Sequence, residues 1–199
     1  MTTFPQDIPV ARAEWGLRSN TQTYRSPLSG ATQTLELPGA RWFARLTLPE
    51  LTAAEWRTLA ALLVGLRGQA GRVRLWDHGH PAPAGTALGV PVVSGAGQTG
   101  VALATSGWQA SQSGVLLPGD YVQVGDELKM VMTQVDSNGA GAATIQIEPP
   151  LRQSPAGGSL LVLTRPSCLM MLADDEQTRW LTQAPRRKSV TLDFEEALT

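Results

Sequence analysis

Apolar and polar residues alternate with a period of two along much of this chain, which is the pattern of β-strands with one buried face. The clearest case is the segment 41–48, whose apolar face consists of Trp42, Ala44, Leu46 and Leu48. The segment 34–37 alternates in the same way, and Pro38-Gly39 lies between the two runs as a turn signal. The pattern therefore predicts a hairpin formed by these two runs.

One segment has helical spacing instead. Residues 52–55 match a capping box, in which a threonine hydroxyl and a glutamate carboxylate each accept a hydrogen bond from a free amide at the helix start. Apolar residues then recur on one helical stripe: Trp56, Leu59, Leu63 and Leu66. We expect a helix over 52–66 whose stripe is buried against a sheet, followed by a strand over 72–76.

The composition changes after this first stretch. Residues 80–85 contain two prolines and a glycine, which is typical of an exit from a domain, and residues 85–114 are small, polar and rich in glycine. Further on, Asn138-Gly139 predicts a tight hairpin, and Pro149-Pro150 predicts the end of a strand. The strands expected in this region are 90–93, 101–103, 121–124, 128–135, 143–147 and 160–163.

Regular alternation returns near the C-terminus, where Val190, Leu192 and Phe194 alternate with polar residues. A well-patterned strand after a self-contained β segment indicates that a first domain is interrupted and then completed. We therefore predict a mainly β fold with one amphipathic helix, in which a β-sandwich or split-barrel domain is interrupted by a small inserted β-barrel-like module. Residues 1–80 and 170–199 form the first domain, and residues 81–169 form the insert.

Composition and charge narrow the function classes. The chain of 199 residues is 42% hydrophobic, enough to bury a core, and its formal net charge is −1. Without an excess of positive charge, specific nucleic-acid binding is not expected. The N-terminus has neither the basic nor the apolar part of a secretory signal, and the longest apolar stretch, 60–64, is too short to span a membrane. We expect a soluble protein that is made in a cytoplasm and does not insert into membranes.

The one local cluster of metal-capable groups is Asp77-His78-Gly79-His80, which contains both histidines of the chain. In a strand, His78 and His80 would point to the same face, as a zinc site with two histidine ligands requires. Gly79 and Pro81 favour an irregular loop, and no third ligand lies nearby in the sequence. We therefore expect no metal at this cluster, and a hydrolase that uses Asp77, His78 or His80 is kept as an alternative.

The other candidate groups are interpreted as structural. Cys168 lies in an apolar run and is expected to be a buried, inert thiol. Residues 174–176 (DDE) lack the ligand spacing of a calcium loop, so a solvated turn is expected. Residues 94–100 are glycine-rich, but a strand rather than a helix is expected after them, which excludes a dinucleotide loop. Residues 186–188 (RRK) are expected to be a solvated loop, with a phosphate or partner contact as the alternative. The sequence thus predicts no catalytic, cofactor-binding or metal-binding residues and no cofactor.

Three stretches also carry a family resemblance. They are 37–43 (LPGARWF) leading into 51–57 (LTAAEWR), the strand 71–77 (GRVRLWD), and 117–125 (LPGDYVQVG) running on to 147–152 (IEPPLR). In their order and in the layout of helix, strands and insert, they resemble the distal tail proteins of long, non-contractile-tailed bacteriophages and related prophage elements. The resemblance spans most of the chain but includes no active-site signature.

The resemblance implies a non-enzymatic structural protein of the virion tail. Such proteins form a ring, usually of six copies, that joins the tail tube to the baseplate hub or tip. The implied partners are copies of the chain itself, the tail tube protein, and the baseplate hub or tail-tip protein. In larger members the insert binds the host surface, often a carbohydrate. Here the insert is small, and its expected surface aromatics are limited to Trp108 and Tyr121. A carbohydrate- or receptor-binding tail-tip protein is kept as the alternative function.

Overall fold

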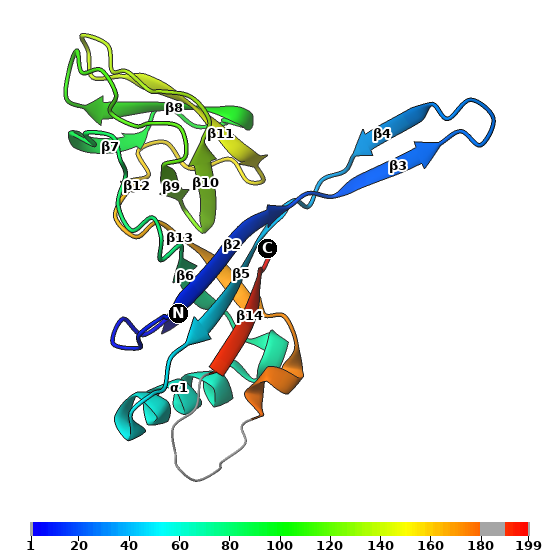
Figure 1. The fold of residues 1–199 in the computed structure, drawn as a ribbon. Coiled ribbons are helices and arrows are strands. Elements are labelled where there is room, and N and C mark those ends of the chain that lie inside the picture. Colours follow the sequence, from blue (N-terminus) through cyan, green and yellow to red (C-terminus); the bar gives the residue numbers. More distant parts are fainter. Residues whose placement is uncertain (1, 180–189, 199) are drawn as a thin grey trace. The chain divides into compact units, whose positions relative to one another are not determined.

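A computed structural model describes residues 2–179 and 190–198 of the chain (Figure 1). The protein is mainly β, with 43% of its residues in strands and 11% in helices, which confirms the fold class expected from the sequence. The chain divides into two compact units. Unit 1 comprises residues 1–73 and 170–199, and unit 2 comprises residues 74–169. Residues 74–80, which the sequence assigned to the first domain, therefore belong to unit 2.

Unit 1 contains most of a six-stranded sheet with the order β1-β6-β13-β14-β5-β2, in which residues 74–76 of β6 and 167–169 of β13 belong to unit 2. In chain order, these strands are β1 (Thr2–Thr3), β2 (Arg12–Arg18), β5 (Arg41–Leu48), β6 (Val73–Trp76), β13 (Ser167–Leu172) and β14 (Val190–Glu196). β5 lies between β14 and β2 and is antiparallel to both. Its four expected inward residues are buried, as are Leu192 and Phe194 on β14. The period-two pattern is therefore confirmed for both segments.

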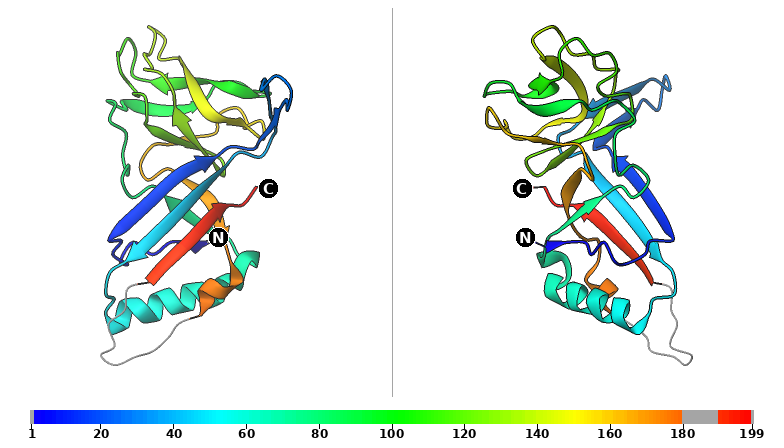
Figure 2. Two further views of the ribbon diagram at one scale, coloured as in Figure 1. Left: turned by 45° about the vertical axis from the view of Figure 1, so that its right-hand side comes forward. Right: turned by 90° about the vertical axis from the view of Figure 1, so that its left-hand side faces the viewer.

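The helix α1 (Ala53–Leu66) begins with the expected capping box. The Thr52 amide donates to Glu55 Oε2 at 2.7 Å, and the Glu55 amide donates to Thr52 Oγ1 at 3.3 Å. The buried face consists of Leu59, Leu62, Leu63 and Leu66. Trp56 is only half-buried, contrary to the expectation, because including Leu62 moves the centre of the stripe away from it. Two 3₁₀ helices, η1 (Gly68–Ala70) and η2 (Asp175–Thr178), lie side by side near the end of α1 (Figure 2).

The predicted hairpin between residues 34–37 and 41–48 is wrong. β4 (Thr32–Glu36) pairs with β3 (Thr21–Arg25), and β5 pairs with β2, so the four strands form one long hairpin (Figure 1). Pro38-Gly39 lies where this hairpin changes register. There the Leu37 amide donates to the Asn20 carbonyl, and the Asn20 side chain donates to the Pro38 carbonyl, both at 2.7 Å. Four residues face two across this point, which makes it a bulge rather than a turn.

Unit 2 contains a six-stranded sheet with the order β12-β9-β10-β11-β8-β7. In chain order, the strands are β7 (Gly89–Val93), β8 (Gly100–Trp108), β9 (Tyr121–Val124), β10 (Glu127–Val131), β11 (Ala143–Leu151) and β12 (Leu161–Val162). An antiparallel bridge between Val92 and Leu160 brings the two edges of this sheet together, so it nearly closes into a barrel. The interior is mainly aliphatic, with Leu103, Val122 and Ile145 fully buried.

Two sequence signals within unit 2 were misinterpreted. Asn138-Gly139 does not form a two-residue hairpin, because residues 132–142 separate β10 from β11. Instead, Asn138 Oδ1 accepts hydrogen bonds from the amides of Ala140 and Ala142 within a longer loop. Pro149 and Pro150 do not end β11. They lie where its register with β8 shifts, a place where a missing amide donor is tolerated.

Candidate functional site

The ribbon formed by β3 and β4 is the largest regular element of the described residues that is exposed throughout. All residues of both strands are exposed, and the two strands form a sheet of their own. Tyr24 and Leu35 on the strands are 63% and 58% exposed, and Leu28 in the tip is 98% exposed. An isolated two-stranded hairpin is at best marginally stable in water. A partner that covers the apolar side chains of the ribbon would therefore stabilise it.

The two faces of the ribbon differ in chemistry. The register pairs Gln22 with Leu35 and Tyr24 with Gln33, which places these four residues on one face, here named the Tyr24 face. The opposite face, here named the threonine face, consists of Thr21, Thr23, Thr32 and Thr34 with Arg25 and Glu36. Both charged residues of the two strands thus lie on the threonine face, and the Tyr24 face is uncharged.

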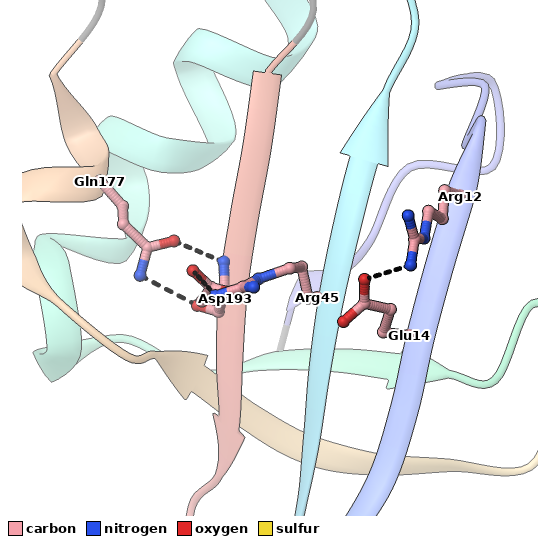
Figure 3. Close-up of polar contacts among 5 residues, drawn as sticks. All are labelled: Arg12, Glu14, Arg45, Gln177 and Asp193. Atoms are coloured by element: carbon pink, nitrogen blue, oxygen red, sulfur yellow. Dashed lines mark hydrogen bonds and ion pairs between the residues drawn. The ribbon is translucent and has the colours of Figure 1, made fainter.

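The outer face of the sheet in unit 1 carries a row of charges across three strands (Figure 3). Glu14 on β2 lies opposite Arg45 on β5, which lies opposite Asp193 on β14. Arg45 Nε donates to Asp193 Oδ1 at 2.6 Å, and this hydrogen bond raises the pKa of Arg45. Arg12 pairs with Glu14 at 2.9 Å, and the Gln177 side chain bonds both the amide and the carbonyl of Asp193. This part of the outer face is therefore covered by the protein's own polar contacts.

A second group on the same outer face combines an aromatic ring with charges. Phe43 on β5 lies opposite Gly16 on β2, and a Cβ atom at Gly16 would come within 2.7 Å of the Phe43 ring. The guanidinium of Arg18 lies 5.6 Å from the centre of that ring and donates to Glu195 at 2.6 Å. Glycine at position 16 lets the ring lie flat on the sheet beneath the ion pair.

The Asp77–His80 segment forms a loop, as the glycine and proline indicated. The His80 amide donates to the Asp77 carbonyl at 3.0 Å, and His80 Nδ1 lies 2.7 Å from Asp77 Oδ2. His78 instead stacks on Trp76, with ring centres 4.9 Å apart, and burial lowers the pKa of its imidazole. Each histidine is thus held by a different neighbour. Within residues 2–179 and 190–198, no group of three or more His, Cys, Asp or Glu side chains could hold a metal ion.

The remaining polar candidates in unit 1 also have structural contacts. Asp175 Oδ1 accepts from the Gln69 amide at 2.7 Å, and Asp174 Oδ1 accepts from the Glu176 amide at 2.9 Å. Asp175 therefore holds η2 against η1, and Asp174 caps η2. The basic run 186–188 lies outside the described residues.

In unit 2, Cys168 is buried, as expected. The expectation that Trp108 and Tyr121 are surface aromatics is wrong, because they are only 4% and 6% exposed. The positive φ of Gly107, 88°, breaks the alternation of β8 and turns Trp108 inward, where its Nε1 donates to Thr105 Oγ1 at 2.8 Å. Tyr121 lies on β9, whose four residues are all buried.

Several charged groups of unit 2 are buried within it. Lys129 is fully buried, and its ammonium contacts Glu127 Oε2 at 2.5 Å and the Pro150 carbonyl at 2.8 Å. Glu127 also accepts hydrogen bonds from the amides of Arg152 and Gln153. Burial raises the pKa of Glu127, but these contacts outweigh it and hold the pKa below its ordinary value. Together they tie the end of β11 to β10.

A second buried carboxylate fixes the segment between β6 and β7. Asp120 accepts hydrogen bonds from the amides of Ala84 and Gly85 and from that of Leu117, at 2.6, 3.1 and 2.8 Å. The glycine-rich loop 94–100 leads into β8, a strand, so it is not a dinucleotide loop. These loops are held by hydrogen bonds within the unit.

No protein-family model and no curated protein sequence matches this chain. Among the described residues, no helix is long and apolar enough to cross a membrane.

The ribbon itself was missed by the sequence reasoning, although a signal for it exists. Residues 21–25 and 32–36 both alternate threonine with larger side chains, and a serine, proline and glycine-rich stretch separates them. That is a hairpin pattern with a longer turn. Residues 34–37 were predicted as a strand but were given the wrong partner, and residues 21–25, which include no aliphatic side chain, were not predicted as a strand.

Proposed function

We propose that this chain is a structural protein of a bacteriophage-type tail, which forms a ring and joins the tail tube to the baseplate hub or tip. Six copies are the usual number in the family that the chain resembles. The chain acts through assembly and carries out no catalytic turnover. The single observation that supports this most is the ribbon of β3 and β4, a paired element whose apolar side chains Tyr24, Leu28 and Leu35 are exposed in the described part of the chain.

The ribbon suits ring formation for a physical reason. A ring of identical subunits with head-to-tail contacts needs two different surfaces on each copy, one of which reaches the next subunit. A ribbon that continues beyond its parent sheet is such a reaching element, and its unpaired strand edges add hydrogen-bonding groups to its apolar side chains. The rest of unit 1 has a capped helix and an apolar core of its own, so the ribbon is available for contact with a partner.

The carbohydrate-binding alternative receives less support. Sugar-binding surfaces commonly use exposed aromatic rings, because these combine a flat apolar face with a polar rim. The aromatic residues of unit 2 are Trp76, Trp108 and Tyr121, and all three are buried. Tyr24 is exposed, but it lies on the ribbon and not in the insert.

The proposal is tested by assembly. The purified protein is examined by sedimentation over a range of concentrations and is then mixed with purified tail tubes and with a hub protein. A ring-sized species, or capped tubes, is expected. A variant in which a short glycine linker replaces residues 22–35 should lose this association while keeping its circular dichroism spectrum. Val64→Ser, which changes an equally exposed residue on α1, is the control. A chain that stays monomeric and binds neither tubes nor hub would refute the proposal.

A further inference from the structure

Unit 2 contains a long stretch without charge. No Asp, Glu, Lys or Arg occurs from Pro81 to Gly119, nor from Gln153 to Thr164. Soluble surfaces usually contain about 25–35% charged residues, and the cores of protein contact surfaces are depleted in them. The two stretches supply β7, β8 and β12, so one side of the nearly closed sheet is built entirely from uncharged residues.

The fold gathers exposed apolar side chains on this uncharged side. Val92 on β7 is bridged to Leu160, just before β12, and continuing this antiparallel register brings Val90 opposite Val162. Alternation places all four on the outer face, while Pro91, Val93 and Leu161 point inward and are buried. Val90 and Leu160 are 67% and 61% exposed. These four residues, Val90, Val92, Leu160 and Val162, are named the closure face here, because they lie where the edges of the sheet meet.

We propose that the closure face binds the Tyr24 face of the ribbon of a second copy of this chain. This inference rests on the proposed function and names the two surfaces that meet in the ring. Both surfaces are uncharged, so their contact removes no ion from water, which is the costly part of burying polar surface. Tyr24 and Leu35 supply apolar area that can cover the exposed valine and leucine side chains of the closure face.

The charged residues of the ribbon also favour a contact through the Tyr24 face over a contact through the threonine face. Arg25 and Glu36 both lie on the threonine face. If that face met the closure face, two ions would lose water against valine and leucine side chains that offer them no hydrogen bond. With the Tyr24 face inward, both ions stay in solvent. The amides of Gln22 and Gln33 can reach the rim of the contact.

The size of the contact predicts its strength. Five residues per strand give a face about 17 Å long and two strands wide. Such a contact is smaller than the roughly 800 Å² per partner that a stable standard interface buries. A single ribbon contact is therefore weak, and association should depend on concentration. A closed ring is more stable than a single pair of copies, because each copy in the ring makes two such contacts.

The test uses two variants that each remove one surface. Tyr24→Asp with Leu35→Asp places charge on the Tyr24 face, and Val90→Asp with Leu160→Asp places charge on the closure face. All four positions are exposed, so both variants should fold, which circular dichroism checks. By sedimentation, each variant alone should be monomeric. An equimolar mixture should form a complex of two copies and nothing larger, because only one intact pair of surfaces remains.

The control is Val64→Asp, which adds charge at an equally exposed apolar residue of α1 and should assemble like the wild type. Milder variants, Val90→Ser with Leu160→Ser, repeat the test if the aspartates unfold the chain. A closure-face variant that still forms the wild-type oligomer, or a mixture that stays monomeric, would overturn the inference. So would a wild type that is monomeric at every concentration. Binding of the protein to tail tubes is measured separately. The inference can therefore be refuted while the proposed function is still supported.

Discussion

The two units use their charged residues in opposite ways. In unit 1, charges pair on the outer face of the sheet, as in Arg45–Asp193 and Arg18–Glu195, where both partners keep contact with water. In unit 2, Asp77, Asp120, Glu127 and Lys129 are buried, whereas Glu196 is the one buried charged residue in the described part of unit 1. Similar residue types thus form solvent-exposed ion pairs in unit 1 and buried polar contacts in unit 2.

This difference has consequences for stability. An exposed ion pair gains little, because water and salt screen it and two flexible side chains must be ordered. A buried pair is not strongly stabilising in itself, but removing one partner leaves an uncompensated charge in the interior. Unit 2 should therefore be sensitive to loss of its charges, and unit 1 should be tolerant.

The sharpest test of this comparison is Glu127→Gln. Glutamine keeps the shape of the side chain but leaves the fully buried Lys129 without its counter-charge. We expect a loss of about 3–5 kcal/mol in the free energy of unfolding of unit 2, measured by urea titration. Glu148→Gln, the same change at a half-buried position on β11, is the matched control and should cost far less. Equal effects of the two changes would contradict the role given to Glu127.

The next test concerns the core of unit 1, which depends on apolar packing. Leu59 on α1 is fully buried, and Leu59→Ala should lower the free energy of unfolding by about 2–5 kcal/mol through lost burial and a cavity. Val64→Ala, at an exposed position of the same helix, should change stability by less than about 1 kcal/mol. A thermal midpoint unchanged by Leu59→Ala would refute the assignment of the buried stripe.

How much of this fold could be predicted depends on how local each signal is. The capping box of Thr52 and Glu55 and the alternation of β5 and β14 are properties of adjacent residues, and they were predicted correctly. Pro38-Gly39 has the composition of a turn, but whether it is a turn or a bulge depends on which distant strand pairs with β4. Here β3 supplies that partner, and nothing within residues 34–43 indicates it.

The sites were predicted less well than the fold, for a related reason. Trp108 was placed on the surface because it lies in a polar, glycine-rich stretch, yet the backbone of Gly107 turns it into the core. Lys129 was not singled out at all, since a lysine between apolar residues looks like the solvent side of a strand. Its burial depends on Glu127 and on the Pro150 carbonyl, and the latter comes from another strand. The exposed ribbon was missed because the pattern of its first strand, β3, is polar.

The buried carboxylate also predicts a pH dependence. The pKa of Glu127 is lower in the folded protein than its ordinary value, so its stabilising effect is present above the unfolded pKa, about 4.3, and is lost as the pH falls. The difference in unfolding free energy between wild type and Glu127→Gln should be constant above about pH 5 and should shrink in more acidic solution. Urea titrations across this range measure it. A difference that grows as the pH falls has the opposite sign and would exclude this linkage.

The smallest expected effect is at the outer face of unit 1. Arg18 contacts both Glu195 and the Phe43 ring, but its side chain is 60% exposed. Arg18→Ala should therefore cost only about 0.5–1 kcal/mol, and Arg18→Lys, which keeps the charge, should cost less. Since surface pairs are screened, part of the difference between the two variants should disappear in about 1 M salt. Thermal unfolding of both variants with and without salt measures this. If Arg18→Ala proved as damaging as Glu127→Gln, the outer-face charges would be as integral to folding as the buried ones, and the contrast between the two units would fail.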